Sequence, residues 1–135
     1  MLAKNLHFAV ITPAHMALNI DAQFVVVPAF DGELGVMPGH AAMLSLLGIG
    51  EVRITTLEGQ IRRLVIRGGF LQVKRAKVTV LTPEAFAPDE IKLDALQTEL
   101  EKLNAEKPIK LDERETLKTK LAWVKARQRV VQAEI

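Results

Sequence analysis

The first two thirds of the chain follow an apolar pattern typical of β-strands. Short runs rich in Val, Ile, Leu and Phe predict strands at 6–12, 15–20, 24–27, 51–57, 61–67, 70–74 and 78–81. Turn signals separate these runs at 12–13, 30–32, 58–59 and 75–76. Their regular spacing favours an antiparallel β-sandwich or barrel. Residues 41–47 fit either a strand or a helical turn, because periodicity alone does not separate the two.

After Phe86 the apolar residues recur every three or four positions, which is typical of amphipathic helices. The apolar stripe of the first predicted helix consists of Leu93, Leu96, Leu100 and Leu103. Asp89 and Glu90 suit the positive N-terminal end of this helix. Asn104 and then Pro108 favour its termination.

A second helix is predicted from Asp112, which can cap it together with Glu115 three residues later. The apolar stripe of this helix consists of Leu117, Leu121, Val124, Val131 and Ile135. Trp123 and Val130 lie off this stripe, beside Arg127, and are expected to form a second apolar patch. This patch suits packing against the predicted strands or against a partner, and for Trp123 we favour core packing. An isolated helical hairpin of this size is only marginally stable, so we expect it to dock elsewhere.

The single change of period divides the chain into two predicted units. Residues 1–86 are expected to form an N-terminal antiparallel β-sandwich, and residues 87–135 a C-terminal antiparallel α-helical hairpin. The predicted fold class is therefore mainly β with α. The sequence contains no internal repeat and no flexible Gly/Ser linker between the units.

Composition limits the classes of function. The chain has 135 residues and 49% hydrophobic content, enough to bury a core. No run reaches the roughly 18 apolar residues of a spanning helix, and the first residues lack the order of a signal peptide, which predicts a cytosolic chain without direct membrane insertion. Zero cysteines exclude disulfides and thiolate metal sites. A net charge of +2 is too small for a nucleic-acid partner.

Motifs for catalysis or metal binding are missing from the sequence. It contains no phosphate loop of the Gly-x-x-x-x-Gly-Lys-Ser/Thr type and no His-x-x-x-His pair. His7 and His15 are interpreted as ordinary strand or turn histidines. We therefore expect a non-catalytic protein without a metal site.

Turn residues and polar residues concentrate in segment 30–50, within an otherwise apolar region. Its glycines accept positive φ at little steric cost, and its proline fixes its own φ. These residues are Gly32, Gly35, Gly39 and Pro38. The polar side chains left to face outward are Asp31, Glu33 and His40. We interpret the segment as a shaped surface loop and expect function there.

Three blocks of the sequence resemble one family. Residues 32–40 read Gly-Glu-Leu-Gly-Val-Met-Pro-Gly-His, and residues 68–73 read Gly-Gly-Phe-Leu-Gln-Val. Residues 77–81 follow as a third block at close range. Together they resemble the epsilon subunit of F-type ATP synthases, which is called delta in mitochondria and which carries a Gly-Glu-Leu-Gly-x-x-Pro-Gly-His loop and a Gly-Gly-Phe-x-x-Val strand. The resemblance spans nearly the whole chain, and we call the first two blocks the first and second motifs.

The resemblance implies a non-catalytic rotor subunit that joins the gamma subunit to the ring of c subunits. In the family the first motif faces the c ring, and the residues that carry over by position are Asp31, Gly32, Glu33, Leu34, Gly35, Pro38, Gly39 and His40. One apolar face of the sandwich is expected to contact gamma. The implied location is the cytoplasmic face of the bacterial inner membrane, as a peripheral part of ATP synthase, with an organelle chain as the open alternative.

The second predicted helix has the strongest charge asymmetry in the chain. After acidic residues at its start, the basic residues that follow without an intervening acid are Lys118, Lys120, Lys125, Arg127 and Arg129. Matching of the helix macrodipole is one explanation of this pattern. In the resembled family, the extended C-terminal helices enter the catalytic head, where such residues meet an acidic stretch of the beta subunit and block hydrolysis. The resemblance therefore adds the alpha and beta subunits as partners of the extended hairpin.

Many bacterial members of this family also bind ATP, through an Ile/Leu-Asp-x-x-Arg-Ala motif and basic residues on the second helix. The residues that match are Leu93, Asp94, Lys125 and Arg129. However, Gln97 replaces the arginine and Thr98 replaces the alanine, and an ungapped register from Ile91 matches less well. Losing the bidentate arginine predicts that ATP binds at most weakly, as a regulatory ligand, and no other cofactor is expected.

Two other functions stay open at this point. A free-standing ligand-binding sandwich or small barrel enzyme would use the glycine-rich segment to rim a pocket. A nucleotide-sensing module would fold its hairpin on ATP, although Gln97 argues against it. The sequence also leaves open whether the hairpin rests on the sandwich or extends along gamma, because both states use the same apolar stripes.

Overall fold

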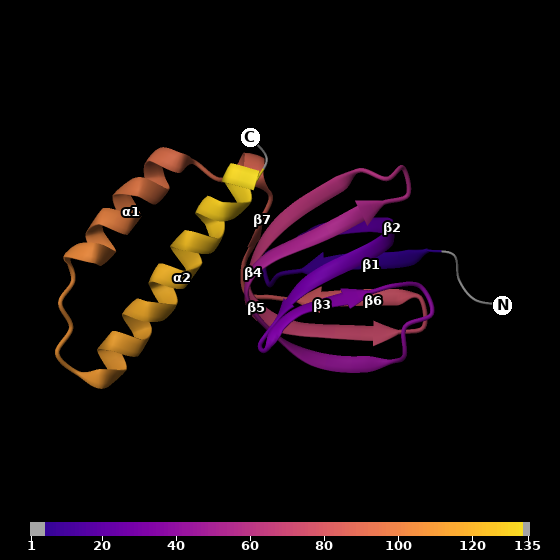
Figure 1. Cartoon of the computed structure of the whole chain (residues 1–135), viewed down its shortest axis with the longest axis horizontal. Helices are drawn as coiled ribbons and strands as arrows, with labels where there is room; N and C mark the ends of the chain where they lie inside the picture. Colours follow the sequence, from indigo (N-terminus) through magenta and orange to yellow (C-terminus); the bar gives the residue numbers. More distant parts are fainter. Residues whose placement is uncertain (1–4, 134–135) are drawn as a thin grey trace.

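The computed structural model describes residues 5–133, in which strands are followed by helices (Figure 1). The strands are β1 (Leu6–Ile11), β2 (Met16–Ala29), β3 (Gly32–Val36), β4 (Met43–Thr56), β5 (Ile61–Lys74), β6 (Lys77–Leu81) and β7 (Ala85–Phe86). The helices are the 3-10 helix η1 (Pro88–Glu90), α1 (Leu93–Ala105) and α2 (Leu111–Ala133). The predicted β-sandwich followed by a helical hairpin is confirmed. Ile135, which the sequence adds to the second apolar stripe, lies outside the described residues.

The strands form one sheet that closes on itself. Its order is β1-β6-β5-β4-β2-β3, with a further pairing of β1 with β2 and of β7 with β5. All of these pairs are antiparallel except β1 with β6, so the predicted antiparallel arrangement is correct apart from one pair. Closure leaves an interior that only inward-facing side chains fill.

Three strands are longer than the sequence predicts. The predicted strands 15–20 and 24–27 are one strand, β2, whose register shifts between Ala22 and Phe24. Likewise β5 runs unbroken through Gly68 and Gly69, and the ambiguous segment 41–47 supplies the first half of β4. The prediction of separate strands was wrong because a glycine or polar interruption of an apolar run marks a bend inside a continuous strand here.

The interpretation of the first motif as a surface loop was also wrong in part. Gly32–Val36 is the edge strand β3, which pairs with β2 so that Leu34 faces Val27 and Val36 faces Val25. Leu34 and Val36 alternate with polar or small residues and turn toward the core, where Val36 is fully buried. This alternation stabilises a strand despite the glycines beside it.

The core of the sandwich is built by strand residues. Its largest fully buried side chains include Phe8, Ile54, Ile66 and Leu71, which come from β1, β4 and β5. This main cluster contains no residue of α1 or α2. The sandwich therefore has an interior of its own, independent of the hairpin.

The hairpin packs on the sandwich through α2, with α1 on the far side (Figure 1). One face of α2 buries Val124 against Leu96 and Leu103 of α1. Another face buries Trp123 and Val130 against the sandwich, which confirms the predicted second apolar patch. No helix within residues 5–133 is long and apolar enough to cross a membrane.

The helix ends differ from the predictions. Asp89 and Glu90 belong to η1, and α1 begins only at Leu93 after an extended residue at Lys92. Leu93 is therefore at the first position of α1 and is 46% exposed, instead of packing with the leucine stripe. Similarly, α2 begins at Leu111, so Asp112 lies inside its first turn instead of preceding it.

Candidate functional site

The glycines of the first motif are required by backbone shape or by packing. Gly32 has φ of 138° directly after the turn between β2 and β3, and Gly39 has φ of 86° in the turn after β3. Residues other than glycine rarely adopt such φ angles. Gly35 is needed for a different reason, because a Cβ at this position would meet the ring of Phe24 at 3.0 Å. The motif thus describes a defined hairpin and turn.

The other residues predicted for this site lie along the same segment. Asp31 and Glu33 are exposed, whereas Leu34 packs against the core. Pro38 and His40 are half-buried in the turn that follows β3. The backbone N–H of His40 donates to the carbonyl of Met37 at 3.1 Å, and its Nδ1 lies 2.7 Å from the Ala41 carbonyl, which requires a proton on Nδ1.

Glu33 is held by a charged residue that sequence reasoning missed. Arg53 of β4 donates from Nη2 to Glu33 Oε2 at 2.6 Å. Arg53 stands in register opposite Arg63 of β5, and Arg63 donates from Nε to Glu51 Oε1 at 2.9 Å. Two ion pairs therefore lie side by side on this face of the sandwich.

The second motif makes β5 bend. Gly68 has φ of 76° and Gly69 has φ of 116°. A Cβ on Gly69 would clash with the backbone oxygen of Leu81 on β6. After the bend, Leu71 is fully buried while Phe70 is 49% exposed on the outer face.

Phe70 belongs to a row of apolar side chains that crosses five strands. Neighbours in this row are directly opposite each other in register, and the row, which we call the apolar row, consists of Leu46, Phe70, Leu81, Ile11 and Met16. Paired residues point to the same side of a sheet, and the next residues along, such as Leu47 and Leu71, are buried. Leu46 and Met16 are about half exposed, and Leu44 beside the row is 72% exposed. The row therefore lies on the outer surface.

The hairpin is held on the sandwich by a cluster around Trp123, which we call the dock. Trp123, Ala126 and Val130 of α2 are buried against Val65, with Ile49 and Phe86 beside them. The dock covers β4 and β5 at positions different from those of the apolar row.

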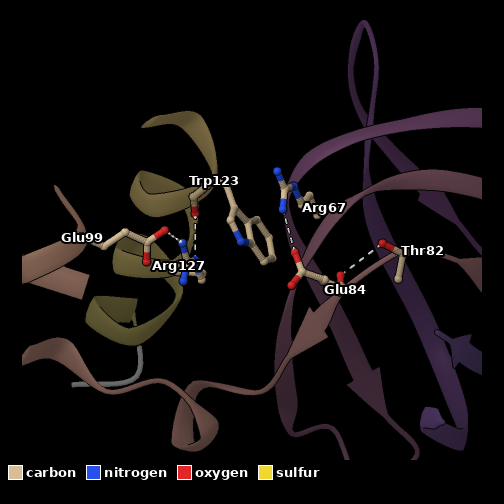
Figure 2. Close-up of polar contacts among 6 residues, drawn as sticks. All are labelled: Arg67, Thr82, Glu84, Glu99, Trp123 and Arg127. Atoms are coloured by element: carbon tan, nitrogen blue, oxygen red, sulfur yellow. Dashed lines mark hydrogen bonds and ion pairs between the residues drawn. The ribbon is translucent and has the colours of Figure 1, made fainter. Parts of the chain in front are cut away.

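Figure 2 shows the charged residues around the Trp123 ring. The Arg127 guanidinium of α2 lies 4.9 Å from the ring centroid, and that of Arg67 on β5 lies 5.9 Å away. Arg127 Nη2 donates to Glu99 of α1 at 2.8 Å, and Arg67 Nη1 donates to Glu84 at 2.9 Å. The indole therefore joins α2 to the sandwich, and Arg127 joins α2 to α1.

The five basic residues predicted on α2 do not share one environment. Lys118, Lys125 and Arg129 line a groove of about 440 Å³ together with Arg114 and the apolar side chain of Ile49. Lys120 is exposed in another part of the hairpin. Arg127 is only 14% exposed, because it is engaged by Glu99 and Trp123. The groove joins positive charge to an apolar floor, which suits an acidic amphipathic partner.

The residues predicted for a nucleotide site lie on two helices. Leu93, Asp94 and Gln97 are exposed on α1, where the Gln97 side chain donates to Glu101 at 3.3 Å. Lys125 and Arg129 line the α2 groove described above. The exposed Gln97 supplies no charge for a phosphate.

Arg53, Arg67, Glu84 and Glu99 were absent from the predictions for the site. Each is an ordinary charged residue in the sequence, and its partner is fixed by strand register or helix packing. The apolar row left a weak signal, since the runs around Leu46 and Phe70 are apolar on both alternating faces.

Comparisons with known proteins find similarity to both parts of the chain. A family model described as ATP synthase, Delta/Epsilon chain, beta-sandwich domain matches residues 5–88. A protein from Carboxydothermus hydrogenoformans named ATP synthase epsilon chain is 38% identical over 101 residues, which are 75% of each chain. One of the same name from Desulforamulus reducens is 29% identical over 133 residues, covering 98% of this chain and 100% of that protein. Among solved structures, the cryo-EM structure of Euglena gracilis mitochondrial ATP synthase (OSCP/F1/c-ring, rotational state 1) contains a similar chain, with a TM-score of 0.86, 21% identity and coverage of 97% of this chain and 84% of that one.

Proposed function

Because this chain belongs to the family of ATP synthase delta and epsilon chains, we propose that it is a non-catalytic subunit of the central stalk, which links the gamma subunit to the c ring. As part of that complex it lies at the cytoplasmic face of a bacterial inner membrane. Residues 1–86 provide the link, and residues 87–135 form a regulatory hairpin that slows ATP hydrolysis.

The apolar row carries the proposal of a gamma interface. It crosses the five strands of the closed sheet, so at a strand spacing of about 4.8 Å it follows about 19 Å of the curved outer surface. Exposed apolar side chains that form a contiguous patch are typical of protein interfaces. The strands beneath the row belong to a rigid core, and a rotor link needs such rigidity to transmit torque without slipping.

The first motif is the part that we assign to the c ring. Its glycines fix a tight hairpin and turn, and Asp31 is exposed at the tip. A polar, preorganised segment suits the polar loops that a membrane ring presents to the cytoplasm. This assignment rests on the resemblance as well as on the exposure.

The groove on α2 supports the proposed inhibition of hydrolysis. Its basic residues would meet an acidic stretch of the beta subunit once the hairpin extends. The dock must open first, because Trp123 is buried in it. Inhibition is thus expected to compete with docking.

The test is ATP hydrolysis by the catalytic head and gamma, reconstituted with the chain. The whole chain is expected to bind and inhibit, and a chain truncated after Phe86 to bind without inhibiting. Phe70→Glu should lose binding, because it places a charge in the apolar row. Leu57→Glu is the matched control, since Leu57 is 45% exposed but lies in the turn between β4 and β5.

Each outcome decides a separate point. Binding of Phe70→Glu at the level of the unmodified chain would contradict the assignment of the apolar row to gamma. Equal inhibition by the whole and the truncated chain would contradict the role of the hairpin. If the unmodified chain does not bind gamma, the link itself is wrong.

A further inference from the structure

Arg127 differs from the other basic residues predicted on α2. Within residues 5–133 it is the one member of that set with an ionic partner, which is Glu99. Its side chain is only 14% exposed, although a guanidinium stays charged at every physiological pH. A positive charge that is largely removed from water is costly unless it is paired and hydrogen-bonded. The docked hairpin therefore depends on the groups that hold Arg127.

Three contacts hold this guanidinium in place (Figure 2). Nη2 donates to Glu99 Oε1 at 2.8 Å, Nε donates to the Trp123 carbonyl at 3.3 Å, and the group lies 4.9 Å from the centroid of the indole. Among the three, only Glu99 carries the opposite charge, and it belongs to α1. Because the carbonyl and the ring already orient the guanidinium, the pair is more ordered than two mobile side chains at a surface. Removing the carboxylate would leave the buried charge of Arg127 without neutralisation.

The nearby acids within residues 5–133 have other partners and do not replace Glu99. Glu90 lines the same cavity as Glu99, but it accepts from the backbone N–H of Ala87 at 2.9 Å. Glu84 lies on the sandwich side of the indole, where it accepts from Arg67 at 2.9 Å. Loss of Glu99 is therefore expected to favour a released hairpin, in which water solvates the arginine of α2.

The face of α2 that carries Arg127 also carries the apolar part of the dock. Trp123, Arg127 and Val130 are three or four residues apart, so they lie on one side of the helix. Trp123 and Val130 are buried against Val65 of β5. In the docked hairpin this face thus meets an apolar surface of the sandwich and a carboxylate of α1. A partner that takes over the released face needs the same two features, an apolar pocket and an acid beside it.

We propose that Glu99 is an internal substitute for the acidic partner of α2, so that the hairpin and the catalytic head compete for Arg127. The inference rests on the proposed inhibition of hydrolysis and adds a restraint to it. While Glu99 holds Arg127, α2 stays docked and hydrolysis continues. When an acid of the beta subunit takes the guanidinium, Glu99 is released to water. One charge-assisted hydrogen bond replaces another, so Glu99 weakens inhibition without abolishing it.

The test compares two neutral variants of the pair, because competition predicts different effects of the two on hydrolysis. Glu99→Gln keeps the size of the side chain, and Arg127→Met keeps an unbranched apolar stem beside Trp123. Glu101→Gln is the matched control, since Glu101 is an exposed acid on the same helix and its neighbour is Gln97. All variants are made in the full-length chain, and thermal unfolding confirms that the sandwich is folded in each.

The first readout is amide hydrogen exchange at residues 121–130 of the isolated chain, because a released hairpin is only marginally stable. Exchange should speed up about three- to ten-fold in both Glu99→Gln and Arg127→Met, as expected for an ion pair that is partly buried. Glu101→Gln should leave it unchanged.

The second readout is the residual rate of ATP hydrolysis by the catalytic head and gamma at a saturating concentration of the chain. Glu99→Gln should lower this rate about three-fold or more, because it releases α2 with Arg127 intact. Arg127→Met should leave the rate unchanged or raise it, because the released helix then lacks the charge that the head binds. Glu101→Gln should inhibit like the unmodified chain.

Faster exchange in both variants, with stronger inhibition by Glu99→Gln alone, supports the proposal. A purely structural pair would give both variants the same effect on hydrolysis, so equal inhibition by the two would overturn the competition. Unchanged exchange in Glu99→Gln would overturn the restraint. If the unmodified chain and Glu99→Gln both bind gamma without inhibiting, the proposed function of the hairpin fails and the competition fails with it, whereas exchange shows separately whether Glu99 holds α2.

Discussion

Replacing Trp123 by alanine is expected to release the helical hairpin and leave the sandwich folded. Trp123 is 4% exposed and is the largest side chain of the dock. The main cluster of the sandwich contains no helix residue, so it does not depend on this contact. The expected product is a folded sandwich with a mobile hairpin.

The magnitude follows from the buried ring. A buried aromatic side chain covers about 150–250 Å², which at about 25 cal/mol per Å² gives an upper value of about 4–6 kcal/mol. Truncation of a buried Trp to Ala costs about 3–5 kcal/mol when the site collapses only in part. The contacts of the ring with Arg67 and Arg127 at 5.9 and 4.9 Å belong to the same loss. A change of about 3–5 kcal/mol raises the population of the released hairpin by a factor of about 10² to 5 × 10³.

Limited trypsin digestion measures this population, because α2 carries several lysines and arginines. When opening and closing are fast, cleavage tracks the population of the open form. Leu111→Ala is the control on the same helix, since Leu111 is 73% exposed. An unchanged rate of cleavage within α2 in Trp123→Ala would refute the dock. Loss of the sandwich in the same transition would refute its independence from the hairpin.

Two further predictions concern the second motif and the nucleotide. Gly69→Ala should lower the free energy of unfolding by about 3 kcal/mol, because it combines backbone strain with a clash against the Leu81 carbonyl. Gly59→Ala is the control: Gly59 has φ of 85° and open space around it, so this substitution should cost only the backbone strain, about 1 kcal/mol. Equal losses of stability in chemical denaturation would contradict the clash. ATP should bind weakly or not at all, because the exposed Gln97 offers no charge; a clear micromolar isotherm in calorimetry on the isolated chain would contradict this.

The strand and helix pattern was predictable where a local rule decides it. Alternation and helical period identified both parts of the chain, and the position of Trp123 off the leucine-rich stripe predicted a second packing face, which the dock confirms. The joined strands were not predictable, because Gly69 reads as a break in the sequence but is held inside β5 by pairing with Leu47 on β4. Tertiary pairing thus overrides the local signal.

The candidate site shows the same division. Gly32 and Gly39 of the first motif were identified correctly as positions of positive φ, whereas Gly35 has no positive φ and is needed because of its packing against Phe24, which the sequence did not predict. The partner of Glu33 was not predictable, because Arg53 lies 20 residues away and register alone brings the two together. The role of Arg127 was missed for a similar reason, since Glu99 lies on the other helix, 28 residues away.

The two apolar surfaces of the sandwich place a condition on the proposed regulation. The chain covers one of them itself, at Val65, and leaves the apolar row around Phe70 open. A docked hairpin therefore does not compete for the row, so attachment to gamma and inhibition by the hairpin are separable. Extension of the hairpin, however, exposes Trp123 and Val65 to water, at a cost of several kcal/mol. The proposed brake requires a binding site in the catalytic head that buries an aromatic ring as well as neutralising basic charge, and an acidic stretch alone would not hold the extended state.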